Sequence, residues 1–468
     1  MAATTPVSPS SNRMPPGIPY IVGNEAAERF CYYGINGILV VFMTQYLLNG
    51  AGQRATLSNT DAEGWYHVFV SAVYYLPILG AILADAILGK YRTILCLSLV
   101  YCLGSVVLAA DSTRLGLVMG LGLIALGSGG IKPCVSANVG DQFGPTNQHL
   151  LPRIFTWFYF SINLGSALST IVTPWLLEPY TRNAKIASFL PGSLLSMLES
   201  IPHGAAIAFG LPGVFMLLAT VVFWTGRKKF AHVPPAGLSH YAHEMLNKEN
   251  VKALGNLLML VPFAAMFWAL WQQNFSSWVV QAYSMDRNLF GMEWLPAQIQ
   301  TVNPVFVLVL LPLSSYVIYP AIERFWKLNP LRKMGMGMFA LILSFVIVAL
   351  IQMRIDAGGK PHILWQILAF VPLTAADVLV SVPHLEFSYT QAPKKMKSLV
   401  MCLYLGAIAL GNTFTAAVNF FIQNKDGSSK LQGATYFWFF AVLMLVTAIA
   451  YIPVARRYPA TEPVEDQA

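Results

Sequence analysis

Two acidic residues and one basic residue interrupt the first long apolar stretch of the chain, residues 18–48. A charged side chain at the centre of a bilayer costs about 2.5–3.5 kcal/mol even on the gentler insertion scales. The spacing of Glu25, Glu28 and Arg29 places all three on one face of a helix. We therefore expect this face to line a protein interior or a wet cavity, where such charges typically mark a route for a solute or a proton.

Two further charged residues of this kind lie in later apolar stretches. Lys132 follows a run of glycines and precedes Pro133, which favours a broken or closely packed helix facing a cavity over snorkelling of the lysine to the interface. Asp377 has no cation nearby in its own helix. We expect this carboxyl group either to take up a proton or to find a partner across a cavity.

Other polar residues carry weaker signals. His384 shares a helical face with Asp377 but is more typical of a packing residue, and Glu386 is rotated away, at a position suited to a gate or an interface. Asn163 and Asn303 are amides in otherwise apolar stretches, where such a group commonly bonds only to neighbouring backbone.

The elements that must position these residues are predicted to be membrane helices. The chain is 56% hydrophobic and 11% charged over 468 residues, whereas a soluble protein carries about 25% charged residues. We identify twelve stretches long enough to cross ~30 Å of hydrocarbon, at 18–48, 64–87, 91–110, 114–136, 153–177, 203–225, 256–283, 297–320, 335–353, 361–388, 397–422 and 432–455. This pattern predicts an all-α polytopic membrane protein.

The net charge of +8 reports topology and not nucleic-acid binding. Alternate loops are rich in Lys and Arg, with twice as many on one side as on the other, which predicts that both termini are cytoplasmic. The five cysteines lie in or beside apolar stretches without a CxxC pair, so neither a disulfide nor a zinc site is expected.

The longest inner connection separates the first six apolar stretches from the last six. The sequence therefore predicts a six-helix bundle (18–225), a cytoplasmic linker (226–256) and a second six-helix bundle (257–456), with a disordered tail before them (1–17) and a second tail after them (457–468). Transporters built from such repeats bind their solute near the midplane, between the halves. Signatures of the HExxH, GxSxG and Walker A types do not occur in the sequence, so we expect neither an enzyme nor a bound cofactor.

Several motifs carry a resemblance to a known family. Residues 25–34, EAAERFCYYG, resemble the ExxERFxYYG signature of the proton-dependent oligopeptide transporters, a family of the major facilitator superfamily. Residues 158–165, FYFSINLG, match its FYxxINxG signature, and residues 80–92, 127–143, 300–304 and 385–412 are similar to further family motifs. The resemblance implies the major facilitator fold, with twelve helices in two bundles. Some members have two added helices between the halves or a large outer domain after the ninth span, but the connections at 226–256 and 354–361 are too short for either, as in bacterial members.

The resemblance also implies a function and roles for residues. It implies a symporter in the cell (inner) membrane, working as a monomer among membrane lipids, that imports di- and tripeptides with protons by alternating access. Arg29 and Lys132 would face the peptide carboxylate, and Glu25 and Glu28 would form proton-sensitive pairs with them.

The remaining roles concern the other end of the peptide and its side chains. By the resemblance, Asn163, Asn303 and Asp377 would hold the amino end, with Asp377 standing where the family usually has Glu. Four aromatic residues would complete the site, two by hydrogen bonds and two by lining side-chain pockets: Tyr33, Tyr74, Trp268 and Tyr404.

Two positions depart from the family pattern. Asn36 stands where bacterial members usually have Arg, and Gln272 stands where the seventh span usually carries an acid. We expect a hydrogen bond between Asn36 and Gln272 to replace the salt bridge of a gate. Proton coupling would then depend on Glu25, Glu28, Arg29, Lys132 and Asp377.

Alternatives remain open. The same fold could carry nitrate or another small anionic or zwitterionic solute, since the usual Arg–acid pair is missing. A drug exporter of the superfamily is a further alternative, which is expected to lack the set Asn163, Asn303 and Asp377. Nucleic acid is not an expected partner.

Overall fold

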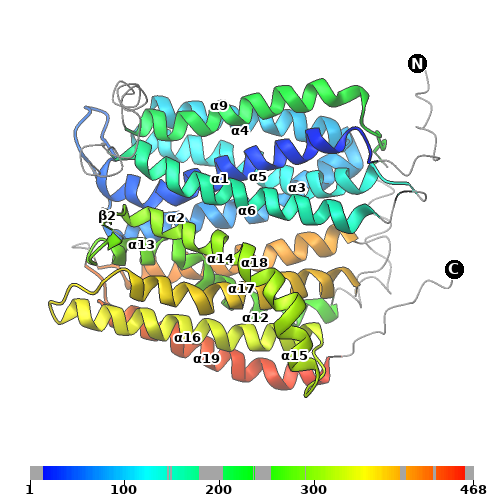
Figure 1. Cartoon of the computed structure of the whole chain (residues 1–468). Coiled ribbons are helices and arrows are strands. Elements are labelled where there is room, and N and C mark those ends of the chain that lie inside the picture. The colour runs from blue at the N-terminus through cyan, green and yellow to red at the C-terminus, as the bar shows by residue number, and fades with distance from the viewer. Residues whose placement is uncertain are drawn as a thin grey trace.

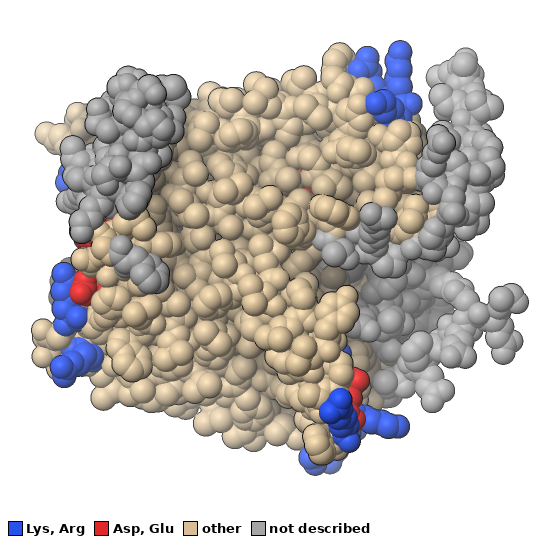
Figure 2. All heavy atoms as spheres, in the orientation of Figure 1, with Lys and Arg blue, Asp and Glu red and all other residues tan. Residues whose placement is uncertain are grey.

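The computed structural model describes residues 14–144, 147, 150–178, 204–235, 237, 255–289, 291–390, 397–424 and 428–458. Long helices run from one end of the molecule to the other (Figure 1). Within the described residues, ten helices are long and apolar enough to cross a membrane. On the face shown in Figure 2, the charged side chains gather at the two ends and leave a wide uncharged surface between them. The predicted polytopic helical class is confirmed.

The first half contains six spans. In chain order, its elements are α1 (Ile18–Gln45), α2 (Asn59–Tyr75), α3 (Pro77–Ile82), η1 (Leu83–Leu88), α4 (Lys90–Ala110), α5 (Arg114–Asp141), α6 (Leu151–Leu177), α9 (Ala205–Thr225) and the turn η4 (Gly226–Lys228). The second span is continuous from α2 through η1. The first span, α1, is as long as the others but is not among the ten because it is more polar.

The second half also contains six spans. Its elements are α12 (Val261–Trp271), η5 (Gln272–Phe275), α13 (Ser277–Ala282), β1 (Asn288–Leu289), β2 (Met292–Glu293), η6 (Pro296–Thr301), α14 (Val302–Leu313), η7 (Ser314–Ile318), α15 (Tyr319–Glu323), α16 (Pro330–Asp356), α17 (Leu364–Thr390), α18 (Lys397–Ile422) and α19 (Ala434–Arg457). The turn η5 divides the seventh span into two short helices.

The two halves lie one above the other in Figure 1, and the described chain starts, at α1, and finishes, at α19, at the same end of the molecule, which we call the end that carries the termini. Helix α1 packs against α6 and α9, and α16 packs against α17 and α19. The halves meet where α2 contacts α18 and where α6 contacts α14. The limits proposed for the bundles, linker and tails stay predictions, and most residues of the tails and linker lie outside the described part of the chain.

Helix α5 corrects one expectation about Lys132. The helix is not broken at Pro133 but continues to Asp141, so Lys132 lies deeper than the predicted span end at 136 implies. The second expectation, a closely packed helix, is met, because the glycines that precede Lys132 allow a close approach. A Cβ atom at Gly80 of α3 would lie 2.1 Å from the carbonyl oxygen of Gly130 in α5. This backbone contact fixes the helix that carries Lys132 against α3.

Hydrogen bonds join the halves from the middle of the molecule to the end opposite the termini. His67 of α2 bonds through Nδ1 to Asn412 Oδ1 (2.7 Å) and through Nε2 to Ser276 Oγ (3.1 Å). The hydroxyls of Thr170 and Thr301 lie 2.9 Å apart. Further bonds join Ser71 to Ala409 and Thr413, Tyr75 to Thr413, Gln298 to Ile171, Gln300 to Gly37, and Gln423 to Ser58.

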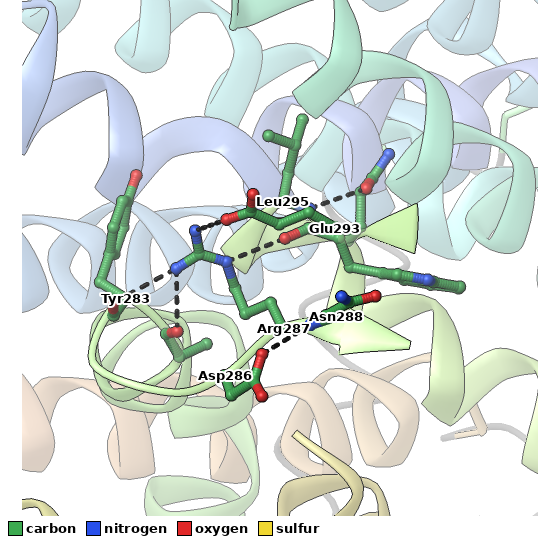
Figure 3. A network of polar contacts seen from close by, with 9 residues as sticks. Tyr283, Asp286, Arg287, Asn288, Glu293 and Leu295 are labelled. Atoms are coloured by element: carbon green, nitrogen blue, oxygen red, sulfur yellow. Dashed lines mark hydrogen bonds and ion pairs between the residues drawn. The ribbon is translucent and has the colours of Figure 1, made fainter. Parts of the chain in front are cut away.

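A network around Arg287 orders the same end of the second half (Figure 3). Its guanidinium donates to the carbonyl of Trp294 (2.9 Å) and to those of Ala282 and Tyr283, and it pairs with Glu293 at 2.8 Å. These bonds tie the end of α13 to the small β1–β2 hairpin. They therefore fix the start of η6, the turn that leads into α14.

Candidate functional site

The charged residues of α1 form one buried cluster. Arg29 pairs with Glu25 at 3.0 Å and also with Glu28. Glu25, Glu28 and Arg29 are 5%, 0% and 6% exposed. The predicted helical face is therefore turned into the protein, where a carboxylate and a guanidinium compensate each other's loss of hydration.

Glu28 has a second partner that the sequence argument overlooked. Ser128 of α5 donates a hydrogen bond of 2.6 Å to Glu28 Oε1. Ser128 and Lys132 are four residues apart, so they share the face of α5 that meets α1. That spacing was visible in the sequence and is the signal that could have identified the serine.

Lys132 lies beside the cluster but does not join its ion pairs. Its Nζ atom is buried without a hydrogen-bond partner among the described residues and lies 4.2 Å from the ring centroid of Tyr32 and 5.4 Å from that of Tyr74. The guanidinium carbon of Arg29 lies 5.6 Å from the same Tyr32 ring. The expected pairing of Lys132 with Glu25 or Glu28 is thus wrong for this conformation, because Arg29 engages both carboxylates.

Two of the three polar residues expected at the amino end of a peptide lie in the second half. Asp377 accepts a hydrogen bond from Ser381, one turn further along α17. Asn303 of α14 accepts one from Thr374 Oγ1 at 2.8 Å. These partners lie within the second half.

Asn163 of α6 completes that set from the first half. Its Nδ2 donates to the carbonyl of Tyr159, 2.9 Å away on the same helix. Such a bond to neighbouring backbone is the one expected from the sequence for a buried amide.

Tyr33 connects the two sides of the site. Its ring stacks on Phe275 of η5, with centroids 6.1 Å apart. It lies within electrostatic reach of both Arg29 and Asp377. Tyr404 of α18 is likewise within reach of Asp377 and of Tyr33. The structure therefore brings the basic residues of the first half and the acid of the second half around shared tyrosines.

The positions along the helices agree with this arrangement. Arg29 lies eleven residues from the start of α1, and Lys132 lies nine residues from the end of α5. At 1.5 Å per residue, both are about 15 Å from the end of the molecule that carries the termini. Asp377 is thirteen residues from the end of α17, or about 20 Å from the same end.

The remaining aromatic and histidine residues line the second half. Trp268 is 5% exposed, its ring contacts Trp271 edge to face, and its Nε1 atom lacks a hydrogen-bond partner among the described residues. His384 packs against Tyr404 with ring centroids 4.8 Å apart. The contact fits the packing role expected for His384. The side chain of Glu386 lies outside the described part of the structure.

The expected gate bond between Asn36 and Gln272 is absent from this structure. Asn36 Nδ2 donates instead to the hydroxyl of Tyr66 at 3.1 Å. Asn36 Oδ1 and Gln272 Oε1 are both buried without a hydrogen-bond partner among the described residues. Asn36 thus bonds to Tyr66 of α2 and not to Gln272 of η5. The sequence did not reveal this choice of partner.

His67 is another residue that the sequence argument missed. It is fully buried, and it joins the halves through Asn412 and Ser276. A histidine within an apolar helix was a visible signal, but its partners lie hundreds of residues away.

Comparison with known proteins decides the family. The model of the POT family matches residues 91–245 and 238–439. The chain belongs to the POT family. Among curated relatives, "Peptide transporter family 1" of Drosophila melanogaster is 36% identical over 396 residues, which cover 75% of this chain and 50% of that protein. Human "Solute carrier family 15 member 2" is 36% identical over 73% of this chain and 49% of its own length. The POT-family chain thus spans about half the length of these relatives.

Solved structures of the POT family share the whole fold. The crystal structure of the POT family transporter PepTSo is similar with a TM-score of 0.82 and 32% identity, covering 96% of this chain and 99% of that one. The structure of an auto-inhibited POT family peptide transporter is similar with a TM-score of 0.81 and 31% identity, covering 96% and 98%. The predicted major facilitator fold is therefore confirmed, and the family is one of transporters.

Proposed function

We propose that this POT-family chain is a proton-coupled symporter that imports di- and tripeptides across the cell membrane. The observation that carries the proposal is that Arg29 and Lys132 both lie at the ring of Tyr32, while the next residue, Tyr33, is within electrostatic reach of both Arg29 and Asp377. A peptide is a zwitterion, and opposite charges at opposite ends of one site are complementary to it. The relatives that are named as peptide transporters support this choice of substrate.

The carboxylate end of the peptide would bind at Lys132. This ammonium is buried and lacks an anionic partner among the described residues, and an uncompensated buried charge strongly favours any ligand that neutralises it. Tyr74, which faces the same ammonium, would donate its hydroxyl to the carboxylate. The amino end would bind at Asp377, with Asn163 and Asn303 as hydrogen-bond acceptors.

Protons would control access to Arg29. Glu25 and Glu28 hold this guanidinium in the structure. A proton on either carboxyl group removes its negative charge and weakens that hold, so that Arg29 can turn toward the peptide. The empty site holds two cations and three carboxyl groups, namely Arg29, Lys132, Glu25, Glu28 and Asp377. When all five are ionised its net charge is −1, so one proton makes the site neutral.

Alternating access would follow from breaking and remaking the contacts between halves. The hydrogen bonds at the end opposite the termini close that end in the structure. With both termini cytoplasmic, as the distribution of Lys and Arg favours, this is the outward side. The protein would act as a monomer, with the proton as its coupling ion and without a cofactor.

Uptake into liposomes tests the proposal. Purified protein should accumulate labelled dialanine when a pH gradient, acid outside, is applied. Lys132→Ala should abolish uptake and counterflow. Glu28→Gln should lose gradient-driven accumulation while it keeps counterflow, because it mimics the protonated acid. Lys229→Ala is a matched control, since Lys229 also lies over a tyrosine ring (Tyr20, 4.6 Å) but outside the site.

One observation favours a second candidate, a nitrate or other anion transporter. Asn36 and Gln272 are both neutral and do not pair, so an element of the usual peptide-transporter gate is missing. Counterflow of dialanine against nitrate separates the candidates. Exchange with nitrate but not with dialanine would reject the peptide proposal.

A further inference from the structure

A cavity lies away from the proposed peptide site, at the end of the first half that carries the N-terminus. It measures about 730 Å³ and lies between the start of α4, the end of α5 and the chain that follows α9. We propose that this cavity binds a phosphate group, carried either by the headgroup of an anionic lipid or by free phosphate. Neither the peptide site nor proton coupling is needed for this inference.

The charged side chains that line the cavity are mostly basic. Lys90, Arg92, Arg227 and Lys228 contribute four positive charges, and Asp141 contributes one negative charge. Asp141 is already paired with Lys90 at 2.6 Å. The lining therefore keeps three uncompensated positive charges (4 − 1 = 3), a surplus that attracts an anion.

Backbone donors face the same space. Helix α4 begins at Lys90 without a side-chain cap, after Gly89, which has φ of 81°. The first N–H groups of a helix have no acceptor within it, and the positive end of the helix dipole favours negative charge. A helix of 21 residues that starts at the wall of a basic cavity is thus suited to phosphate oxygens.

A buried amide supplies an independent sign of a missing ligand. Asn138 of α5 lines the cavity and is 2% exposed, and its Nδ2 atom has no hydrogen-bond partner among the described residues. Its Oδ1 atom accepts only a long bond from Gln142, at 3.4 Å. A buried donor without an acceptor costs free energy. A phosphate oxygen in the cavity would satisfy it.

The cavity lies at the boundary between the apolar belt and the charged rim. Ile87, which lines it, is 47% exposed, and Arg227 stacks on the exposed ring of Trp224 at 4.0 Å. Exposed tryptophan beside arginine is typical of the headgroup level of a membrane. Basic pockets between helices at this level suit anionic headgroups. Figure 2 shows basic side chains at both ends of the molecule, beside the uncharged belt.

The experiment compares two phosphate sources on the full chain. In one arm, native mass spectrometry measures retention of phosphatidylglycerol relative to phosphatidylcholine. In the other, protein in phosphatidylcholine nanodiscs is titrated with inorganic phosphate against chloride of equal ionic strength, and its melting temperature is followed. The test variant is Arg92→Gln/Lys228→Gln. The control is Arg324→Gln/Lys327→Gln, which removes two exposed charges after α15.

We expect the affinity of the test variant for phosphatidylglycerol or for inorganic phosphate to fall by on the order of tenfold, and the affinity of the control variant to stay unchanged. Loss in the lipid arm alone assigns a lipid headgroup, and loss in the phosphate arm alone assigns free phosphate. Asn138→Asp should weaken the same arm, because its carboxylate replaces the free amide donor with a repelling charge. Equal effects of test and control variants, or binding that is unchanged in both arms, would overturn the proposal.

Discussion

The Nζ atom of Lys132 lies 4.2 Å from the ring centroid of Tyr32, and no described residue offers it a hydrogen-bond acceptor. A desolvated cation over an aromatic face gains about 2 kcal/mol, which is less than an ion pair in the same place would give. The tyrosine therefore holds the ammonium without satisfying it. This arrangement keeps Lys132 available for an incoming carboxylate while Arg29 stays with Glu25 and Glu28.

Replacing the ring of Tyr32 tests this relationship. Tyr32→Leu removes the aromatic face, so Lys132 is free to move to Glu28 and compete with the peptide. We expect the KM for dialanine to rise by about five- to thirtyfold, which corresponds to about 1–2 kcal/mol. Tyr32→Phe keeps the face and should behave nearly as the parent protein. Equal losses in the two variants would show that the hydroxyl, and not the face, is needed.

Ser128→Ala tests the buried hydrogen bond to Glu28. The substitution leaves one oxygen of a fully buried carboxylate without its donor, at a cost of about 1–3 kcal/mol. We expect a lower melting temperature by fluorescence-detected size exclusion. Ser136→Ala, about two turns further along α5, should not change it. A melting temperature that is the same in both variants would contradict the assigned bond.

Gln272→Glu tests which acids couple protons to uptake. The new carboxyl group would lie in a buried position whose amide oxygen now has no partner. We expect it to change the pH profile of uptake by adding an acid, whereas Glu28→Gln flattens the profile by removing one. If neither substitution changed the profile, the assignment of coupling to the α1 cluster would be wrong.

His67→Ala tests the closed end of the structure. The substitution removes two bonds between the halves, to Asn412 and to Ser276, so conformations open at that end should become more populated. Spin labels at Ser58 and Gln423, which bond to each other across the halves, should report longer distances. His362→Ala, a partly exposed histidine near the same end that bonds to Asn288 within the second half, serves as control and should leave the distances as they are.

Gly80→Ala tests the contact that positions α5. The added Cβ would overlap the backbone of Gly130, which cannot give way without moving the helix. Overpacking of this kind costs about 1–3 kcal/mol, and we expect both the yield of folded protein and dialanine uptake to fall. Gly122→Ala in α5 meets no atom within 4 Å and should be tolerated. Loss of function in both variants would argue against a specific contact.

The sequence predicted correctly those features that depend on the residue spacing within a single helix. The charged face of α1 follows from helical spacing and from the cost of burying charge, and the structure turns this face into the protein as expected. The depth of Lys132 was underestimated, because α5 extends beyond the predicted end of its span. The family motifs, which extend along most of the chain, predicted the major facilitator fold.

Pairing between helices was less predictable. Lys132 can pair with Glu25 or Glu28 only if Arg29 does not already bind these carboxylates. The helical spacing within α5 says nothing about the partners of Arg29, which lies in α1. Similarly, Asn36 bonds to Tyr66 because α2 lies beside α1 at that level, although Gln272 was the expected partner. Pro133 did not end α5, since neighbouring helices support a span after a proline has interrupted its bonds.

The contacts that close one end of the molecule have an electrical consequence. Among the described residues, the side chains other than His67 that bond the halves together there are hydroxyls and amides, which carry no formal charge. A charge that moves through the membrane voltage exchanges about 2.3 kcal/mol per 100 mV, and a neutral group exchanges none. The voltage would therefore drive the cycle through the proton and the charged residues in the centre, while the seam between the halves opens equally readily at any potential.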